Sequence, residues 1–231
     1  VRYSLKNPHS YLHANLEGQL AILETVRKAP KIERLIYASS SSVYGGNQKT
    51  PFAVEDRVEK PLSFYAATKR SGELMCQAYH SLYGTKMIGL RFFTVYGPWG
   101  RPDMAIYAFT EKILRGETIE LYNRGKMKRD FTYIDDIISG CLSCLDLEFS
   151  GHKIYNLGNH RAEELEKLVQ VLEKTIGQKA KIKYIPLQKG EPEETYADIS
   201  LANQELAFTP QTTIDQGIPQ FISWHRQYYN W

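Results

Sequence analysis

Residues 33–42 read Glu33-Arg34-Leu35-Ile36-Tyr37-Ala38-Ser39-Ser40-Ser41-Ser42. The run from Glu33 to Ala38 is apolar in its second half and predicts a short β-strand that ends at the serines. In α/β folds, ligands bind outside the carboxyl ends of the strands. We therefore expect the serine hydroxyls to lie at a ligand site.

A helix and a second strand are predicted after the serines. Small and apolar residues recur at helical spacing from Ser63 to Leu82, and Gly84 follows as a stop signal. Residues 86–93, Lys-Met-Ile-Gly-Leu-Arg-Phe-Phe, then read as the next strand. This order of strand, polar segment, helix and strand predicts an α/β fold with its site at the polar segment.

Tyr65 and Lys69 stand four residues apart at the start of the predicted helix. Residues at this spacing share one helix face, so the lysine ammonium can lie beside the phenol. A nearby positive charge favours the phenolate, which can act as a general base. With a serine hydroxyl holding the substrate oxygen, the pair suits the oxidation of an alcohol. A Tyr-x-x-x-Lys pair also occurs by chance, but its place after the strand and the serines favours the catalytic interpretation.

The rest of the chain predicts helices alternating with strands, without internal repeats. The expected helices are residues 10–28, 103–115, 135–147, 162–176 and 214–229, and the expected further strands are residues 119–122, 153–158 and 180–186. Pro219 should mark the first turn of the last helix or kink it.

Composition and charge set limits on the kind of protein. The 231 residues are 42% hydrophobic and 24% charged with a net charge of +3, which suits one or two globular domains. No apolar run approaches the roughly 20 residues that span a bilayer, so we expect no membrane partner. The cysteines lack a disulfide-like spacing, and we therefore expect a cytoplasmic protein. Lys126, Lys128 and Arg129 indicate solvated surface rather than nucleic-acid binding, because the cluster is short and the chain nearly neutral. No residue pattern indicates a metal site.

Five motifs run in order through nearly the whole chain. They are Tyr37-Ala38-Ser39-Ser40-Ser41-Ser42-Val43-Tyr44-Gly45, Tyr65 with Lys69, Arg91-Phe92-Phe93-Thr94-Val95-Tyr96-Gly97-Pro98, Arg129-Asp130-Phe131-Thr132-Tyr133-Ile134-Asp135-Asp136 and Tyr155-Asn156-Leu157-Gly158-Asn159. At these residues the chain resembles the extended short-chain dehydrogenase/reductase family of nucleotide-sugar epimerases and dehydratases. Residues 98–104 and 125–129 look most like those of UDP-glucuronate 4-epimerases.

The resemblance implies a partial doubly wound, Rossmann-like parallel sheet with a smaller carboxyl-terminal substrate domain. Residues 1–98 would be the remnant of a NAD-binding domain, and residues 99–231 a UDP-sugar domain whose segment 135–160 returns to the sheet. Family members begin with a strand, a Gly-x-x-Gly-x-x-Gly turn and a helix that bind the dinucleotide pyrophosphate. This sequence contains no such glycine spacing. We therefore expect two to three strand–helix units of roughly 30 residues each to be missing, and the chain to be inactive alone.

The resemblance also assigns residue roles. It implies that Ser40 bridges the sugar O4 and Tyr65, that Tyr65 removes the proton, and that Lys69 holds the nicotinamide ribose of NAD. Asn15 is either a satisfied buried amide or, as in the family, a residue that orders the site. The remaining NAD-side positions, which without a cofactor would be ordinary strand-end packing, are Ala38, Ser39, Phe92 and Val95.

Residues beside the catalytic serine favour a uronate substrate. Dehydratases and decarboxylases of the family carry carboxylates at the places of Ser41 and Ser42, and this chain has neither. Two hydroxyls, with that of Thr94, would instead hydrogen-bond a uronate carboxylate. The alternative is that Ser41 and Ser42 merely cap a turn.

The remaining implied contacts are with the nucleotide. Arg129 matches the family's diphosphate-binding arginine, and a guanidinium can take two phosphate oxygens at once. Arg101 would contact the nucleotide or its lid, and Asp198 would contact the uridine ribose.

The predicted reaction is 4-epimerisation of UDP-glucuronate to UDP-galacturonate through a 4-keto sugar. Alternatives are another epimerase, such as one for UDP-galactose, or a non-enzymatic remnant that binds nucleotide-sugar or dimerises. The helices 10–28 and 63–83 would form a homodimer interface.

Overall fold

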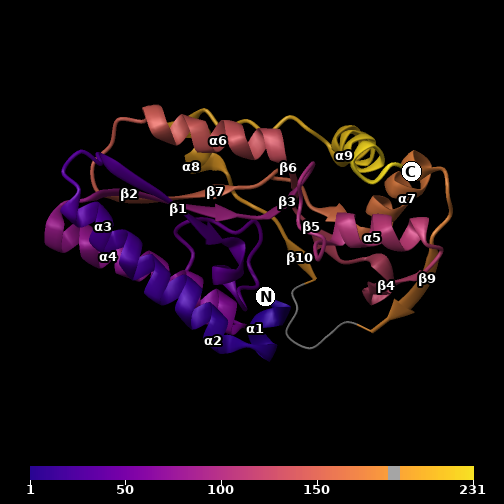
Figure 1. The fold of residues 1–231 in the computed structure, drawn as a ribbon, viewed down its shortest axis with the longest axis horizontal. Coiled ribbons are helices and arrows are strands. Elements are labelled where there is room, and N and C mark those ends of the chain that lie inside the picture. Colours follow the sequence, from indigo (N-terminus) through magenta and orange to yellow (C-terminus); the bar gives the residue numbers. More distant parts are fainter. Residues whose placement is uncertain (187–192) are drawn as a thin grey trace. The chain divides into compact units, whose positions relative to one another are not determined.

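The computed structural model describes residues 1–186 and 193–231, and they form two compact units (Figure 1). Unit 1 comprises Val1–Phe92, Gly140–Leu157 and Asp198–Phe208. Unit 2 comprises Phe93–Ser139, Gly158–Ala197 and Thr209–Trp231. Because the chain passes between the units several times, each unit is assembled from distant parts of the sequence.

The sheet of unit 1 is parallel and has the strand order β1-β2-β7. Its strands are β1 (Arg34–Ser40), β2 (Lys86–Phe92) and β7 (His152–Leu157). Residues 87–91 of β2, the central strand, are buried, as expected when helices cover both faces of a parallel sheet. The predicted α/β class and the Rossmann-like parallel sheet are confirmed.

Helices cover both faces of this sheet (Figure 1). On one face lie α3 (Gly18–Lys28) and α4 (Phe64–Tyr83), and on the other α8 (Ser200–Leu206) and the second half of α6 (Ile134–Asp146). The predicted ends of α4 are confirmed: the Ser63 side chain accepts a hydrogen bond from the Ala66 N–H, and Gly84 adopts a left-handed conformation.

The predicted helix 10–28 is interrupted rather than uniform. Two short helices, α1 (Arg2–Lys6) and α2 (Pro8–Tyr11), are followed by a π-helical segment, η1 (Leu12–Glu17), before α3 begins. Periodicity alone did not reveal this segment, because an α-helix and a π-helix differ little over six residues. The π-helix carries Asn15, and such segments occur frequently at functional sites.

Because Gly89 has no side chain, residues of β1 and β7 can hydrogen-bond each other over the central strand β2. Gly89 pairs with Tyr37 on β1 and with Ile154 on β7. A methyl group on Gly89 would lie 2.5 Å from the Tyr37 hydroxyl, which hydrogen-bonds the His152 Nε2 at 2.7 Å. The glycine is therefore required because the tyrosine side chain lies over it.

Unit 2 combines small sheets with three helices around one apolar core. Its strands pair as β3 (Thr94–Tyr96) with β6 (Phe131–Tyr133), β4 (Thr118–Tyr122) with β9 (Lys181–Ile185), and β5 (Lys128–Arg129) with both β8 (Glu163–Glu164) and β10 (Glu194–Thr195). The helices are α5 (Ala105–Leu114), α7 (Leu165–Ile176) and α9 (Ile214–Tyr229), and η3 (Asn123–Gly125) is a short 3-10 helix.

One prediction for unit 2 was wrong in detail, and one of the two alternatives for Pro219 is excluded. The helix expected from residue 162 begins at Leu165, because Glu163 and Glu164 pair with β5. Pro219 is the sixth residue of α9 rather than part of its first turn. The proline removes one intrahelical donor to Asp215, and the helix nevertheless continues to Tyr229.

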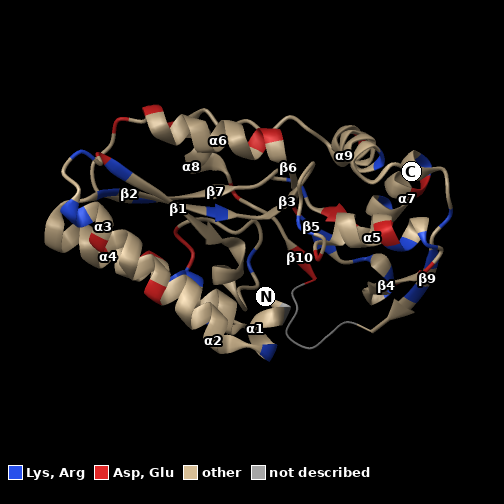
Figure 2. Ribbon diagram, viewed as in Figure 1, with Lys and Arg blue, Asp and Glu red and all other residues tan. Residues whose placement is uncertain are grey.

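Acidic and basic residues are interspersed over the elements of both units (Figure 2), in keeping with the small net charge of +3. Among the helices of the described residues, none combines the length and the apolar character that crossing a bilayer requires.

Candidate functional site

A tight turn at the end of β1 presents the serine run. Ser40 is the last residue of β1 and the N-cap of the 3-10 helix η2 (Ser41–Tyr44). Its Oγ accepts from the Ser42 N–H at 3.2 Å, and its hydroxyl donates to the Ser42 Oγ, also at 3.2 Å. Ser40 therefore caps the turn, so capping does not account for Ser41 and Ser42, which are half-buried.

Helix α4, which packs against β1 and η2, places Lys69 over the end of β1. The Lys69 Nζ donates to the Ala38 carbonyl oxygen at 3.1 Å and lies 6.0 Å from the centre of the Tyr65 ring. Burial lowers the pKa of Lys69, because desolvation penalises the charged ammonium. An ammonium has three donors, so Lys69 retains donors for a ligand.

Tyr65 is held by its backbone and its ring. Its N–H donates to the Ser4 Oγ at 3.2 Å, and its carbonyl oxygen accepts from the Thr68 hydroxyl at 2.8 Å, which in turn accepts from the Asn15 amide at 2.9 Å. The ring packs edge-on against Tyr11, with centroids 5.9 Å apart. No side chain within residues 1–186 and 193–231 hydrogen-bonds the Tyr65 hydroxyl. The phenol is thus oriented and available to a ligand.

A buried ion pair lies beneath the serine turn. The Arg91 Nε and Nη2 donate to the two carboxylate oxygens of Glu73 at 2.8 and 2.9 Å, and the side chains are 2% and 0% exposed. The Ser39 hydroxyl donates to the Glu73 Oε1 at 2.6 Å. Burial works to raise the pKa of Glu73, but the hydrogen bonds and charge of Arg91 outweigh it and lower that pKa. The pair therefore stays ionised at neutral pH.

The network extends from this pair to β7. The Arg91 Nη1 donates to the Tyr44 hydroxyl at 3.0 Å, and that hydroxyl donates to the Asn156 Oδ1 at 2.7 Å. The Asn156 amide donates to the carbonyl oxygens of Phe52 at 2.8 Å and Asp198 at 3.0 Å. Side chains on α4, β2, η2 and β7 thus form one hydrogen-bonded chain within unit 1.

Sequence reasoning missed this network. Two signals were available: Arg91 is a charged residue within an otherwise apolar strand, and Glu73 lies eight residues after Tyr65, on the same helix face. A charge in a buried strand requires a partner. The partner is not identifiable from the sequence, because 18 positions separate the two residues.

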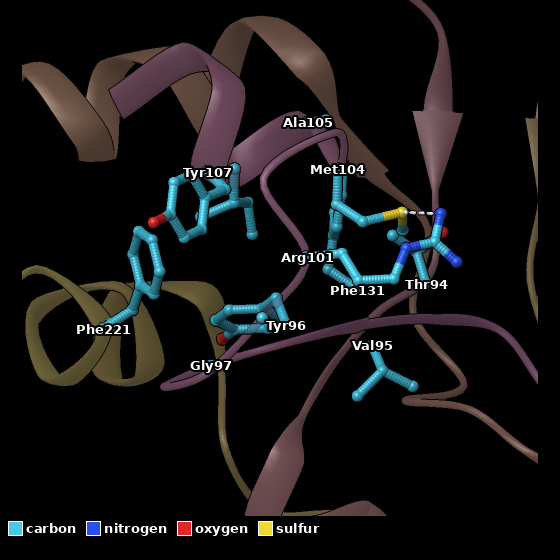
Figure 3. Close-up of a pocket in the computed structure, with 12 residues that line it drawn as sticks. Thr94, Val95, Tyr96, Gly97, Arg101, Met104, Ala105, Tyr107, Phe131 and Phe221 are labelled. Atoms are coloured by element: carbon cyan, nitrogen blue, oxygen red, sulfur yellow. Dashed lines mark hydrogen bonds between the residues drawn. The ribbon is translucent and has the colours of Figure 1, made fainter. Parts of the chain in front are cut away.

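Unit 2 holds a small pocket that is partly open to solvent, and Figure 3 draws the residues that line it. Thr94 and Val95 of β3 line it together with Arg101, and Tyr107, Phe131 and Phe221 contribute apolar walls. The Arg101 guanidinium donates to both carboxylate oxygens of Asp103 at 3.0 and 2.7 Å, and its Nη2 lies 3.9 Å from the Met104 Sδ. The structure therefore brings Thr94, Val95 and Arg101 together at one pocket.

Arg129 lies on β5 of the same unit. Its Nη1 donates to the carbonyl oxygens of Lys128 at 2.8 Å and of Glu193 at 3.3 Å. These contacts hold one nitrogen of the guanidinium against the backbone.

The next residue, Asp130, is buried and joins three backbone segments. Its Oδ1 accepts from the Thr132 hydroxyl at 2.9 Å and the Asn159 N–H at 2.6 Å, and its Oδ2 from the N–H groups of His160 at 3.1 Å and Ala197 at 3.0 Å. Burial raises the pKa of Asp130, and these donors oppose that rise. A methyl group on Gly158 would lie 2.8 Å from Oδ2, so the carboxylate also requires this glycine.

The remaining predicted residues lie in unit 1. Phe92 is the half-buried last residue of β2. The Asp198 N–H donates to the Phe52 carbonyl oxygen at 2.9 Å, and the Asp198 Oδ1 accepts from the Ser200 N–H at 2.8 Å. The predicted site residues of unit 1 are Ala38, Ser39, Ser40, Ser41, Ser42, Tyr65, Lys69, Phe92 and Asp198, and those of unit 2 are Thr94, Val95, Arg101 and Arg129.

Comparison with known proteins identifies the family. Residues 1–158 match the family described as "NAD dependent epimerase/dehydratase family". The chain belongs to this family. The prediction from the five motifs is thereby confirmed.

Relatives and solved structures in the family carry related activities. UDP-glucuronate 4-epimerase 5 of Arabidopsis thaliana is 46% identical over 245 residues, which cover 99% of this chain and 56% of the relative. The crystal structure of UDP-glucuronic acid 4-epimerase from Bacillus cereus, in complex with UDP-glucuronic acid and NAD, is 33% identical with a TM-score of 0.89, covering 97% of this chain and 71% of that chain. UDP-glucose 4-epimerase from Thermotoga maritima, with UDP-glucose, is 27% identical with a TM-score of 0.90, covering 99% and 74%.

The residues present fit the nicotinamide–ribose end of NAD, the cofactor of this family. Ala38 is exposed between the buried Tyr37 and Ser39, so a small side chain leaves room at the end of β1. Lys69 lies over this position with donors available for ribose hydroxyls. The sequence contains no glycine-rich turn for the pyrophosphate, so the fit covers only one end of the cofactor.

Proposed function

We propose that this protein is a NAD-dependent UDP-sugar 4-epimerase that converts UDP-glucuronate to UDP-galacturonate. The observation that carries the proposal is the oriented Tyr65 phenol, whose ring centre lies 6.0 Å from the Lys69 ammonium on a helix packed against the serine turn. This arrangement suits removal of a proton from a sugar hydroxyl. The family relationship supplies the reaction class.

In the proposed mechanism, Ser40 holds the sugar O4 and Tyr65 takes the proton of the 4-hydroxyl group. NAD, when bound, supplies the acceptor for the hydride that leaves C4. The Lys69 ammonium lies 6.0 Å from the centre of the Tyr65 ring, and it would hold the ribose with the donors that Ala38 does not use. The Ser40 hydroxyl, which donates to the Ser42 Oγ in the structure, would exchange that bond for one to O4.

The second half of the reaction reverses the first. After the 4-keto sugar rotates to present its opposite face, hydride returns to C4 on that face. The Tyr65 phenol then gives its proton back to O4. Tyr65 is therefore base and then acid within one turnover, and no cofactor is consumed.

Substrate choice is proposed to depend on Ser41, Ser42 and Thr94. The first two are half-buried hydroxyls immediately after Ser40, and Ser40 rather than either of them caps the turn. Hydroxyls can hydrogen-bond a uronate carboxylate without repelling it. A 4-keto uronate is prone to lose carbon dioxide, and firm hydrogen bonds to its carboxylate would protect it. The resemblance to UDP-glucuronate 4-epimerases agrees with this choice.

The nucleotide is proposed to bind through its diphosphate to Arg129 and through its ribose to Asp198. Arg101 is proposed to contact the nucleotide or the lid over it. Residues 1–98 are proposed as the nucleotide-binding part and residues 99–231 as the substrate part. A cytoplasmic location is proposed from the composition alone.

A homodimer is proposed through the helical segments 10–28 and 63–83. Large apolar side chains there are exposed in the single chain: Leu12 by 39%, Leu20 by 44% and Leu74 by 54%. Sedimentation velocity of the protein and of Leu74→Glu tests this, with a dimer expected for the first and a monomer for the second. A monomer in both cases would contradict the proposal.

The activity is tested by incubating the full-length protein with UDP-glucuronate and NAD and recording proton NMR spectra. UDP-galacturonate should appear, and parallel incubations with UDP-galactose should give little UDP-glucose. Residues 1–231 alone, which the sequence predicts to be inactive, serve as the comparison. Preference for UDP-galactose would favour the other epimerase activity, which the Thermotoga maritima structure makes the next candidate. Tight binding of UDP-sugar without turnover of either substrate would favour a non-enzymatic role.

A further inference from the structure

We propose that Glu73 is a positioning residue that fixes where the serine turn lies against helix α4, an inference that rests on the proposed function. Glu73 does not touch the substrate. It acts through Ser39 and through Arg91, which hold the two ends of the turn that carries Ser40.

The last three residues of β1 are each tied by a different group. The Ala38 carbonyl oxygen accepts from Lys69 at 3.1 Å, and the Ser39 hydroxyl donates to Glu73 at 2.6 Å. Ser40 pairs with Phe92 in the β1–β2 ladder, and its side chain bonds within its own turn. The position of Ser40 relative to α4 therefore depends on the two ties that precede it.

Both ties come from the helix that carries the proposed base. Tyr65, Lys69 and Glu73 follow one another at intervals of four residues and so share a face of α4. Two ties on successive turns prevent the helix from rotating or sliding on β1, because either motion breaks a bond. The Tyr65 phenol thus keeps its place relative to Ser40.

The ion pair also holds the far end of the turn. Arg91 is fixed by both carboxylate oxygens of Glu73 and donates to the Tyr44 hydroxyl at 3.0 Å. Tyr44 is the last residue of η2 and is fully buried. Glu73 therefore holds Ser39 before the turn directly and Tyr44 at its end through Arg91.

An ordinary buried ion pair would contribute to folding and would not need a serine at position 39. The hydrogen bond from Ser39 to Glu73 distinguishes a positioning role of Glu73 from a role in folding alone, because its removal leaves the Glu73–Arg91 pair intact. A third group offers a matched control: the Arg70 Nη1 donates to the same Glu73 carboxylate at 2.9 Å from the partly exposed side. In the described part of the chain, Arg70 makes no hydrogen bond to the turn.

The test compares Ser39→Ala with Arg70→Gln in the purified protein. In Ser39→Ala, kcat for UDP-glucuronate should fall by about tenfold to a hundredfold, since small displacements of catalytic groups have effects of this size, while KM changes little. Amide hydrogen exchange of residues 40–45 should become faster. Arg70→Gln should keep both the wild-type kcat and the wild-type exchange.

Three outcomes would overturn the inference: an unchanged kcat in Ser39→Ala, a fall in kcat that the control shares, or unaltered exchange in the turn. If the wild-type protein epimerises neither UDP-glucuronate nor any UDP-hexose, the proposed function fails. Hydrogen exchange then still decides whether Ser39 and Glu73 hold the turn.

Discussion

Lys69 bonds the carbonyl oxygen of Ala38 at 3.1 Å while its ammonium lies 6.0 Å from the centre of the Tyr65 ring. One side chain thus joins the end of β1 to the proposed base. Because the ring and backbone of Tyr65 are fixed by Tyr11, Ser4 and Thr68, its hydroxyl group can be removed without disturbing the surrounding structure.

Tyr65→Phe should therefore lower kcat by about 10²- to 10⁴-fold, the usual contribution of general acid–base catalysis. UDP-sugar affinity, measured by isothermal titration calorimetry, should be nearly unchanged. Tyr83→Phe, at the exposed end of the same helix, is the matched control and should turn over at the wild-type rate. A large loss of affinity in Tyr65→Phe would count against its role as a base.

Asp130→Asn should destabilise the protein by about 2–3 kcal/mol, because an amide places its own donors against backbone donors and leaves buried N–H groups unpaired. Affinity for UDP-sugar should also fall, because the backbone of the neighbouring Arg129 is then held less firmly in position. Urea unfolding and calorimetry measure the two effects. Asp103→Asn, on the exposed surface, serves as the control for stability, and equal stability of the two variants would refute this role of Asp130.

Gly89→Ala should cost about 1–3 kcal/mol of unfolding free energy, the usual range for overpacking a core. The added methyl group would meet the Tyr37 hydroxyl at 2.5 Å. Gly72→Ala is the matched control: its added methyl group would meet only the Gln19 side chain, at 4.0 Å. That control should be neutral or stabilising because alanine favours the helix. If urea unfolding gives the same sign for both variants, the crowding at Gly89 is not the cause.

Lowering the pH should destabilise the protein through His152. Its Nε2 accepts from the Tyr37 hydroxyl and its Nδ1 faces the Gln77 Oε1, which fits a neutral ring. Burial lowers the pKa of His152 from 6.5 to about 4. Below pH 6.5 His152 therefore binds a proton in the unfolded chain but not in the folded protein. The contribution of His152 to the free energy of unfolding is full above pH 6.5 and is lost as the pH falls toward 4.

Thermal unfolding between pH 7 and 4 checks this expectation. His152→Gln should show a weaker dependence on pH than the wild-type protein. His13→Gln is the control, since the His13 side chain is 82% exposed, and it should follow the wild-type curve. Equal curves for all three proteins would exclude His152 as the source.

The sequence was sufficient to predict what depends on local pattern. The strand before the serines, the start of the helix near Ser63 and the stop at Gly84 follow from neighbouring residues. The π-helical segment around Asn15 was not predictable, because its apolar spacing does not differ from that of an α-helix. The roles of Glu73, Arg91 and Asp130 depend on partners up to 67 positions away in the chain, and only the folded structure identifies them.

The most direct test of the central claim uses UDP-glucuronate labelled with deuterium at C4. If Tyr65 and Lys69 serve an oxidation and reduction at that carbon, proton and deuterium NMR should find UDP-galacturonate that keeps the deuterium at C4, and Tyr65→Phe should form almost none. Product that carries solvent hydrogen at C4, or no product from the wild-type protein with NAD present, would contradict the account.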